Sequence, residues 1–352
     1  MRKALFLLIS ILALQGTAQT EVNTFFSGAN EGVTYYLPDT RIEITVHTTC
    51  ITRTPGEFNP YAQRYLRIGN AISKEETRWE MNGVEVGTTG KPNKEKMYTV
   101  KLNSSTASNV TLNKSGIIEA INARVSHEMM HEAENKGYST PTDATQYMTE
   151  ELLQATSTAK QAELTAKEIY AIRESKLNIT RGLSENMPKD GQSMKLILDE
   201  LDKQERALTE LFTGRTDTVH YSCTYFIDPK LDNDTTKAVL FRFSRKLGVL
   251  DKEDLAGAPV YYNIRDLKSV RKPTAEELAK KKKLLKIEGI CYTVPGKMLF
   301  DIYTMTKTLY KEEIPIAQYG TTEVLSKTMF TKDETPKVLF DTSTGGIISI
   351  EK

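Results

Sequence analysis

The sequence predicts an α+β fold that is mainly β, with two strand-rich, sandwich-like domains and an antiparallel helical hairpin between them. Two observations support this. Segments rich in Val, Ile, Thr and Tyr, divided by Pro, Gly and Asn, fill the regions before about residue 125 and after about residue 213, as is typical of short β-strands. Between these regions, apolar residues recur every three or four positions, which is the period of an amphipathic helix.

The first eighteen residues have the pattern of a secretory signal peptide. Two basic residues precede an apolar run from Ala4 to Leu14, and small residues follow at Gly16 and Ala18. As a helix, this run would extend only about 16 Å, roughly half of a hydrocarbon core. We therefore expect cleavage between Ala18 and Gln19 and an exported mature chain.

Residues 19–125 are predicted to form the N-terminal β domain. Alternation at Ile42, Ile44 and Val46 predicts a strand with one buried face. Residues 126–145 lose this alternation and collect charge together with Gly137 and Pro141, so they are predicted to be a linker. The five predicted strand segments of the domain are "GVTYYLP", "RIEITVHTTCI", "TRWEMNGVEV", "KMYTVKL" and "NVTL".

Residues 146–212 are predicted to form the helical hairpin. The first helix runs to about Glu174, "NITRGLSENMPKDG" breaks it, and the second begins near Asp190. Two helices joined by so short a connection pack antiparallel. The apolar stripe of the first helix comprises Met148, Leu152, Ala155, Ala159, Ala162, Ala166 and Ile169, and that of the second comprises Met194, Ile197, Leu201, Leu208 and Leu211.

Residues 213–352 are predicted to form the C-terminal β domain, with one inserted helix near 274–285. This helix begins at "TAEEL", where Thr274 and Glu277 have the spacing of a capping box. The lysine run that follows is favourable at a helix C-terminus because it opposes the helix dipole. The predicted strands are "TVHYSCTYFI", "KAVLFRFS", "APVYYNI", "GICYTVP", "LFDIYTM", "KVLF" and "GIISI".

An internal repeat connects the two β regions. "EGVTYYLP" at 31–38 returns as "EGICYTVP" at 288–295, and "VTLNKSGIIEAI" at 110–121 is echoed by "VLFDTSTGGIISI" at 338–350. Both echoes occur in the same order. We therefore infer two related β units on either side of the hairpin. The alternative is that common sequence patterns of strands and turns recur by chance.

Charge and cysteine usage restrict the function classes. The chain has 47 basic and 46 acidic residues, a balance that argues against nucleic acid as the main partner. No later segment approaches a membrane-spanning length, so no transmembrane segment is expected in the mature chain. Cys50, Cys223 and Cys291 allow at most one disulfide. They are expected to be small buried strand residues, and whether any two are bridged is left open.

One motif suggests an enzyme. His127, Glu128 and His131 have the spacing His-Glu-x-x-His, which on a helix supplies two zinc ligands and a general base. A third ligand could come from Glu150 or Glu151, which lie near the start of the alanine-striped helix. Acidic residues are favoured at a helix start in any case. A zinc-dependent metallopeptidase is therefore kept as an alternative function.

Two features disagree with the zinc interpretation. The residue after the second His is normally uncharged and packs inward, but here it is Glu132. The longer form of the motif has a Gly where this chain has Glu134. No catalytic residue, cofactor or metal site is therefore predicted in the leading interpretation.

Four blocks of the sequence carry a resemblance to a known family. They are "PGEFNPYAQRYL", "TSTAKQAELTAKEIYAIRESKLN", "GQSMKLILDELDKQERALTELFTG" and "FRFSRKLGVLDKEDLAGAPVY". The chain resembles an uncharacterised family of exported proteins from Gram-negative gut bacteria, known as a domain of unknown function. The resemblance covers most of the mature chain and implies a location in the periplasm or on the outer surface. It carries no catalytic or binding residue to transfer.

The leading functional prediction is a non-catalytic binding or scaffolding module of the bacterial cell envelope. Its partner is expected to be an unidentified envelope protein or a glycan. A glycan-binding module is the second alternative, and it rests on aromatic residues such as Trp79 and Tyr98.

Overall fold

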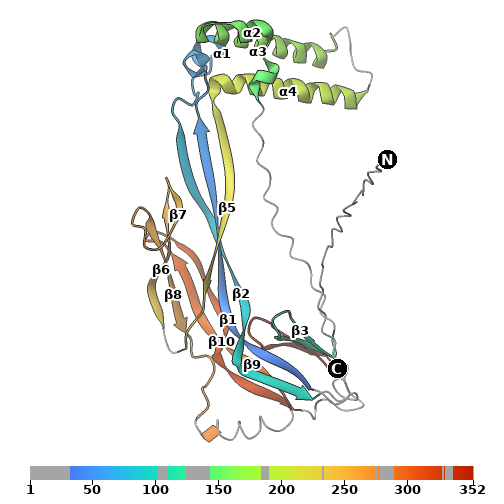
Figure 1. Cartoon of the computed structure of the whole chain (residues 1–352), viewed down its shortest axis with the longest axis vertical. Coiled ribbons are helices and arrows are strands. Elements are labelled where there is room, and N and C mark those ends of the chain that lie inside the picture. Colours follow the sequence, from blue (N-terminus) through green and yellow to red (C-terminus); the bar gives the residue numbers. More distant parts are fainter. Residues whose placement is uncertain are drawn as a thin grey trace, which may run out of the picture.

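The computed structural model describes residues 32–101, 109–123, 143–183, 190–231, 234–274, 276–277, 289–326, 329 and 336–351. The molecule is elongated, with its helices gathered at one end of a long antiparallel ribbon and its other sheets beside the middle and the opposite end of the ribbon (Figure 1). The prediction of a mainly β, α+β fold is confirmed.

The ribbon has three antiparallel strands in the order β2-β1-β5. They are β1 (Gly32–Thr54), β2 (Glu76–Lys101) and β5 (Arg215–Ile227). At about 3.3 Å per residue, β1 extends about 75 Å. Ile42, Ile44 and Val46 are fully buried on one face, which confirms the predicted alternation.

The ribbon is more continuous than the sequence predicts. The segments predicted as four separate strands form only β1 and β2. Pro38 lies within β1 opposite Pro92, and a register shift separates the Tyr36 pair from the Pro38 pair. Proline has no N–H to donate to the ladder. Because the ladder is already irregular at this point, the prolines interrupt the pairing without ending the strands.

A five-stranded antiparallel sheet packs against one face of the ribbon. Its order is β10-β9-β8-β6-β7. Ribbon residues Ile42, Ile44 and Val46 share a core with Phe241 and Phe300 of this sheet. The strands are β6 (Thr235–Ser244), β7 (Gly248–Leu250), β8 (Ala258–Asp266), β9 (Gly289–Tyr303) and β10 (Thr308–Ser326).

A smaller sheet closes the end of the molecule opposite the helices. Its order is β12-β11-β4-β3, and it shares a core with the ends of β1, β2, β9 and β10. At this end the Tyr35 hydroxyl donates to Cys291 O at 2.9 Å and accepts from Cys291 N–H at 2.7 Å. The strands are β3 (Val110–Leu112), β4 (Ile118–Ile121), β11 (Lys337–Phe340) and β12 (Ile347–Glu351).

The sheets do not follow the boundaries predicted from the sequence. The ribbon joins β5 to β1 and β2, and the small sheet joins β11 and β12 to β3 and β4. Strands from before and after the helical hairpin therefore share two of the three sheets. The division into domains at residues 125 and 213 stays a prediction.

The helical head comprises the helical elements carried at the tip of the ribbon. Its core contains Phe58, Ala162, Ile169, Leu208 and Phe212, and it is separate from the two sheet cores. The elements are η1 (Asn59–Tyr61), α1 (Ala62–Leu66), η2 (Ala144–Tyr147), α2 (Glu150–Gln154), α3 (Thr158–Thr180) and α4 (Gly191–Thr213).

The cap residues explain where the long helices begin. Asp190 accepts a hydrogen bond from Ser193 N–H, so α4 begins where the sequence predicts. The first predicted helix, however, is interrupted. Ser157 caps α3 by accepting from Lys160 N–H, and Ala155 ends the short α2. The capping box near 274 is present, because Thr274 N–H donates to Glu277 and Glu277 N–H donates to Thr274 Oγ1.

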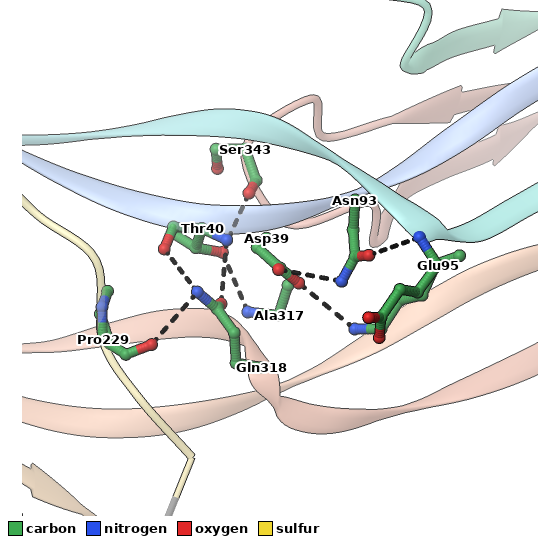
Figure 2. Close-up of polar contacts among 9 residues, drawn as sticks. Asp39, Thr40, Asn93, Glu95, Pro229, Ala317, Gln318 and Ser343 are labelled. Carbon is green, nitrogen blue, oxygen red and sulfur yellow. Dashed lines mark hydrogen bonds and ion pairs between the residues drawn. The ribbon is translucent and has the colours of Figure 1, made fainter. Parts of the chain in front are cut away.

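A buried polar joint fixes the ribbon to β10 (Figure 2). The Thr40 hydroxyl donates to Ser343 O and accepts from Ala317 N–H, each at 2.9 Å. The Gln318 side chain bonds to both Thr40 N–H, at 2.9 Å, and Thr40 O, at 2.8 Å. Gln318 thus continues the ladder beside β1 just beyond the Ile42–Ile227 pair, where β5 ends.

Replacing Thr40 with Val should destabilise the protein by about 1–3 kcal/mol, because the variant leaves the buried Ala317 N–H without an acceptor. The matched control is Thr45→Val on the open face of the same strand. There the hydroxyl lies 3.5 Å from that of Thr224 in an exposed contact, so a change within about 0.5 kcal/mol is expected. Urea unfolding of both variants measures the difference, and equal midpoints would contradict the role of the joint.

Candidate functional site: the corner between the helical head and the ribbon

Two cavities lie where α4 meets the ribbon, with volumes of about 610 and 530 Å³. Both are lined by Glu210, Gly214 and Arg215, so they flank one corner of the molecule. We call these residues and their neighbours the Glu210 corner. The larger cavity extends along α4 past Arg206 and Thr209, and the other reaches Pro55 and η2.

Gly214 makes this corner possible. It follows α4 directly with φ of 77°, a left-handed conformation that favours glycine. A Cβ built on Gly214 would lie 2.4 Å from Thr54 O. The chain can therefore turn from α4 into β5 while the backbone of β1 passes close by.

Most charges around the cavities are paired. Arg173 Nε lies 2.5 Å from Glu205 Oε1, Lys176 also binds Glu205, and Arg215 Nε lies 2.8 Å from Asp217 Oδ2. The first two contacts join α3 to α4 and hold the head together. These charges are satisfied within the protein and contribute to its structure.

Two charges and one hydroxyl in the larger cavity are different. Within the described parts of the chain, Glu210 and Arg206 make no side-chain hydrogen bond or close ion pair. In the same parts, Thr209 Oγ1 is a buried polar atom without a hydrogen-bond partner. Buried polar groups normally have partners, so Thr209 Oγ1 is an exception within α4. Glu210 and Arg206 offer an acceptor and a donor to a molecule bound in the cavity.

The electrostatics of Glu210 support this interpretation. Burial raises the pKa of Glu210, and the attraction of Arg215 and Arg206 offsets the effect only in part. Carboxyl groups with raised pKa values in cavities are candidates for binding or catalysis. Glu205, in the same cavity, has the opposite behaviour. Burial opposes its ionisation, but hydrogen bonds from Lys176 and Arg173 outweigh burial and lower its pKa.

These two shifts predict opposite effects of pH on stability. A carboxyl group whose pKa is raised by folding stabilises the folded protein at low pH, and this contribution is lost as pH rises. Glu210→Gln should therefore increase Tm at pH 7 to 8. The increase should disappear as pH falls toward roughly 4, near the ordinary pKa of Glu. Glu205→Gln should lower Tm at pH 7, and that loss should disappear only at still lower pH. Thermal unfolding across pH tests both variants, and shifts of the same sign would contradict the assignment.

An aromatic and basic surface adjoins the corner through Arg173. We call it the tyrosine–arginine surface, and it comprises Tyr61, Arg64, Tyr65, Tyr170 and Arg173. The rings of Tyr61 and Tyr65 are stacked with centroids 6.0 Å apart. Arg64 lies 5.3 Å above the Tyr65 ring and Arg173 lies 5.6 Å from the Tyr170 ring. Tyr and Arg are enriched among the residues that dominate protein–protein binding energy.

The zinc motif is not tested by the structure. His127, Glu128 and His131 lie outside the described residues. Glu150 is exposed in the first turn of α2, where its carboxylate accepts from Gln154 Nε2 at 2.8 Å. Among the described residues, no group of three or more His, Cys, Asp and Glu side chains could hold a metal ion. The peptidase alternative therefore stays a prediction.

The aromatic residues suggested for glycan binding do not form a common platform. The Trp79 ring lies 5.0 Å from the Tyr221 ring and packs against Gly248. Tyr98 is half-buried beside Tyr35, with ring centroids 6.0 Å apart. The two residues are far apart along β2.

The cysteines are partly as expected. All three are free thiols, and Cys291 is buried as predicted. The prediction was wrong for Cys50 and Cys223, which are half-buried: Cys50 lies in the central strand β1 and Cys223 in the edge strand β5.

No local pattern in the sequence indicates the Glu210 corner, because its lining comes from four distant parts of the chain: 54–57, 143–148, Arg173 and 202–216. The spacing of Arg206 and Glu210, one helical turn apart on α4, is the only local sign, and such pairs are common on solvated helices.

Comparisons with known proteins identify a family but not an activity. No curated protein and no solved structure gave a match. No helix in the described parts of the chain is both long and apolar enough to cross a membrane. A family model described as "Domain of unknown function (DUF4831)" matches residues 31–348. The chain therefore belongs to the DUF4831 family, whose molecular function is unknown.

Proposed function

We propose that this protein is a non-catalytic binding or scaffolding module of the bacterial cell envelope and that its partner binds at the Glu210 corner. The observation that carries the proposal is the pair of cavities that share Glu210 on a helical head held at the tip of the ribbon. Such a head is accessible to a large partner while the sheets remain at a distance (Figure 1).

The chemistry of the corner suggests a protein partner. Glu210 accepts hydrogen bonds and Arg206 donates them. A polypeptide segment with both a basic and an acidic group would satisfy both. The tyrosine–arginine surface then provides aromatic contact area beside the cavity, as found at the energetic centres of protein interfaces.

A predicted signal peptide supports the envelope location. The basic and apolar pattern of residues 1–18 and the small residues before Gln19 are typical of a secretory signal. Fractionation of cells that express the full chain, followed by N-terminal sequencing, tests this part. A periplasmic or surface protein that begins at Gln19 is expected, and an uncleaved cytoplasmic protein would contradict it.

Binding at the corner can be tested with charge-neutral pairs of substitutions. Mature protein, residues 19–352, is used to retain partners from the solubilised envelope of the bacterium that produces it. The double variant Arg206→Gln/Glu210→Gln should lose a retained protein, with a loss of at least about 2 kcal/mol, roughly thirtyfold in Kd. The control Lys252→Gln/Glu253→Gln removes one exposed ion pair, at 3.9 Å, from a loop far from the head.

The control should retain the same protein as the unchanged chain. Retention by both variants alike would show that the corner is not the binding site. Retention of no envelope protein by the unchanged chain would remove the main support for the proposal.

A further inference from the structure

The two sequence echoes form two copies of one hairpin. The β3–β4 hairpin has three residue pairs and the β11–β12 hairpin has four, and each hairpin has a register shift before its last pair. The pairs in the first hairpin are Val110–Ile121, Thr111–Ala120 and Leu112–Ile118, and those in the second are Lys337–Glu351, Val338–Ile350, Leu339–Ser349 and Phe340–Ile347, of which the last three correspond to the first hairpin.

The turns of the two hairpins are also equivalent. Gly116 and Gly345 have φ of 77° and 71°, both in the left-handed region. Gly116 O accepts from Tyr36 N–H and Gly345 O accepts from Thr293 N–H, each at 2.9 Å. Tyr36 and Thr293 occupy the same position in the first echo. The two units therefore share both their hairpins and the way these dock onto β1 and β9.

The two hairpins are joined head to tail. The second strand of the first hairpin, β4, pairs with the first strand of the second hairpin, β11. The junction aligns Ile121 with Val338 and Ala120 with Leu339. The edges of the sheet are consequently β3, a first strand, and β12, a second strand. Inside the sheet a second strand, β4, pairs with a first strand, β11. The two outer edges are therefore complementary, because one is a second strand and the other is a first strand.

The burial of equivalent residues shows the effect of the missing neighbour. In β4, Glu119 is 6% exposed and Ile121 is fully buried. The corresponding residues of β12 are Ile348, which is 66% exposed, and Ile350, which is 41% exposed. Within the described residues, β12 has no strand on its outer side. Proteins usually protect edge strands with charge or irregularity, but β12 presents two isoleucines.

We propose that β12 of one molecule pairs with β3 of a second copy of this chain, in the register of the internal β4–β11 junction. Ile350 would then lie opposite Val110, and Ser349 opposite Thr111. Because the two edges differ, the contact is heterologous and repeats from molecule to molecule, which produces a ring or a filament. This inference goes beyond the proposed function and does not depend on the Glu210 corner.

Cysteine cross-linking tests this register. Thr111→Cys and Ser349→Cys are combined in the mature chain, in a background in which the half-buried Cys50 and Cys223 are replaced by Ser. Within one molecule the two new cysteines are three strand spacings apart, about 14 Å. A disulfide requires Cα atoms within roughly 7 Å. Oxidation should therefore produce a ladder of covalent multimers on a non-reducing gel.

Two comparisons make the result specific. Thr111→Cys with Lys252→Cys, which places the second thiol on an exposed loop, should give no such ladder. The unchanged chain should increase in mass with concentration when it is measured by light scattering. Ile350→Lys should abolish this increase, with circular dichroism as the check on folding. A monomeric Thr111→Cys/Ser349→Cys protein, or a ladder equal to that of the loop control, would overturn the proposal.

Discussion

Phe212→Ala should unfold the helical head while leaving the sheets intact. Phe212 is fully buried in the head core, with its ring 5.4 Å from that of Phe58. Truncation of a buried Phe costs about 3–5 kcal/mol, and the head is held by one small core. We expect the helical signal in circular dichroism to be lost at a much lower temperature than in the unchanged protein, and partner binding to be lost with it.

Phe300→Ala is the matched control for Phe212→Ala. Phe300 is also fully buried, but it lies in the core between the ribbon and the five-stranded sheet. Its loss should lower the stability of the sheets by a similar amount. Loss of helical and strand signals together in the Phe212 variant, at one temperature, would show that the head and the sheets are one cooperative unit and would contradict the separate cores.

Gly320→Ala is expected to be a strongly damaging substitution within a strand. A Cβ on Gly320 would lie 2.0 Å from Val294 O and 2.8 Å from Pro295 Cα, both of them backbone atoms. Gly296 approaches the same region from the opposite strand, because its Cβ would lie 2.4 Å from Tyr319 O. The strands pair on both sides of this point, at Gly296–Ile316 and Val294–Thr321, so a shift of either backbone would disturb that pairing. A loss of about 3 kcal/mol, the upper end of the usual cost of overpacking, is expected in urea unfolding.

Gly87→Ala provides the opposite case in the ribbon. A Cβ built on Gly87 meets nothing within 4 Å. Alanine also reduces the entropy of the unfolded chain, so the variant should be more stable by about 0.5–1 kcal/mol. Similar losses for Gly87→Ala and Gly320→Ala would show that general strand propensity, rather than close approach of β9 and β10, determines both effects.

Local patterns in the sequence predicted local structure well. The alternation at Ile42, Ile44 and Val46, the cap at Asp190 and the capping box at Thr274 all correspond to features of the structure. Strand β10 was not predicted, because Pro315, Gly320 and several charged residues hide its pattern. The sequence also divided the ribbon at Pro38, although a register shift accommodates that proline.

Pairing between distant segments could not be predicted from local patterns. β1 pairs with β5 across the whole helical hairpin, and β4 pairs with β11 across an even longer separation. The alternation of apolar and polar residues along one strand shows which face is buried, but it does not show which strands lie beside it. The Glu210 corner has the same origin, because the turn at Gly214 brings α4 beside β1 and η2.

Site-specific photo-crosslinking in living cells tests the central claim most directly. A photoreactive residue replaces Thr216, an exposed residue that lines the larger cavity. In a second strain it replaces Lys252, on the loop far from the head. The account predicts a covalent adduct with an envelope protein at position 216 and none at 252. An adduct at 252 alone, or no adduct at 216, would contradict the claim that the partner binds at the Glu210 corner.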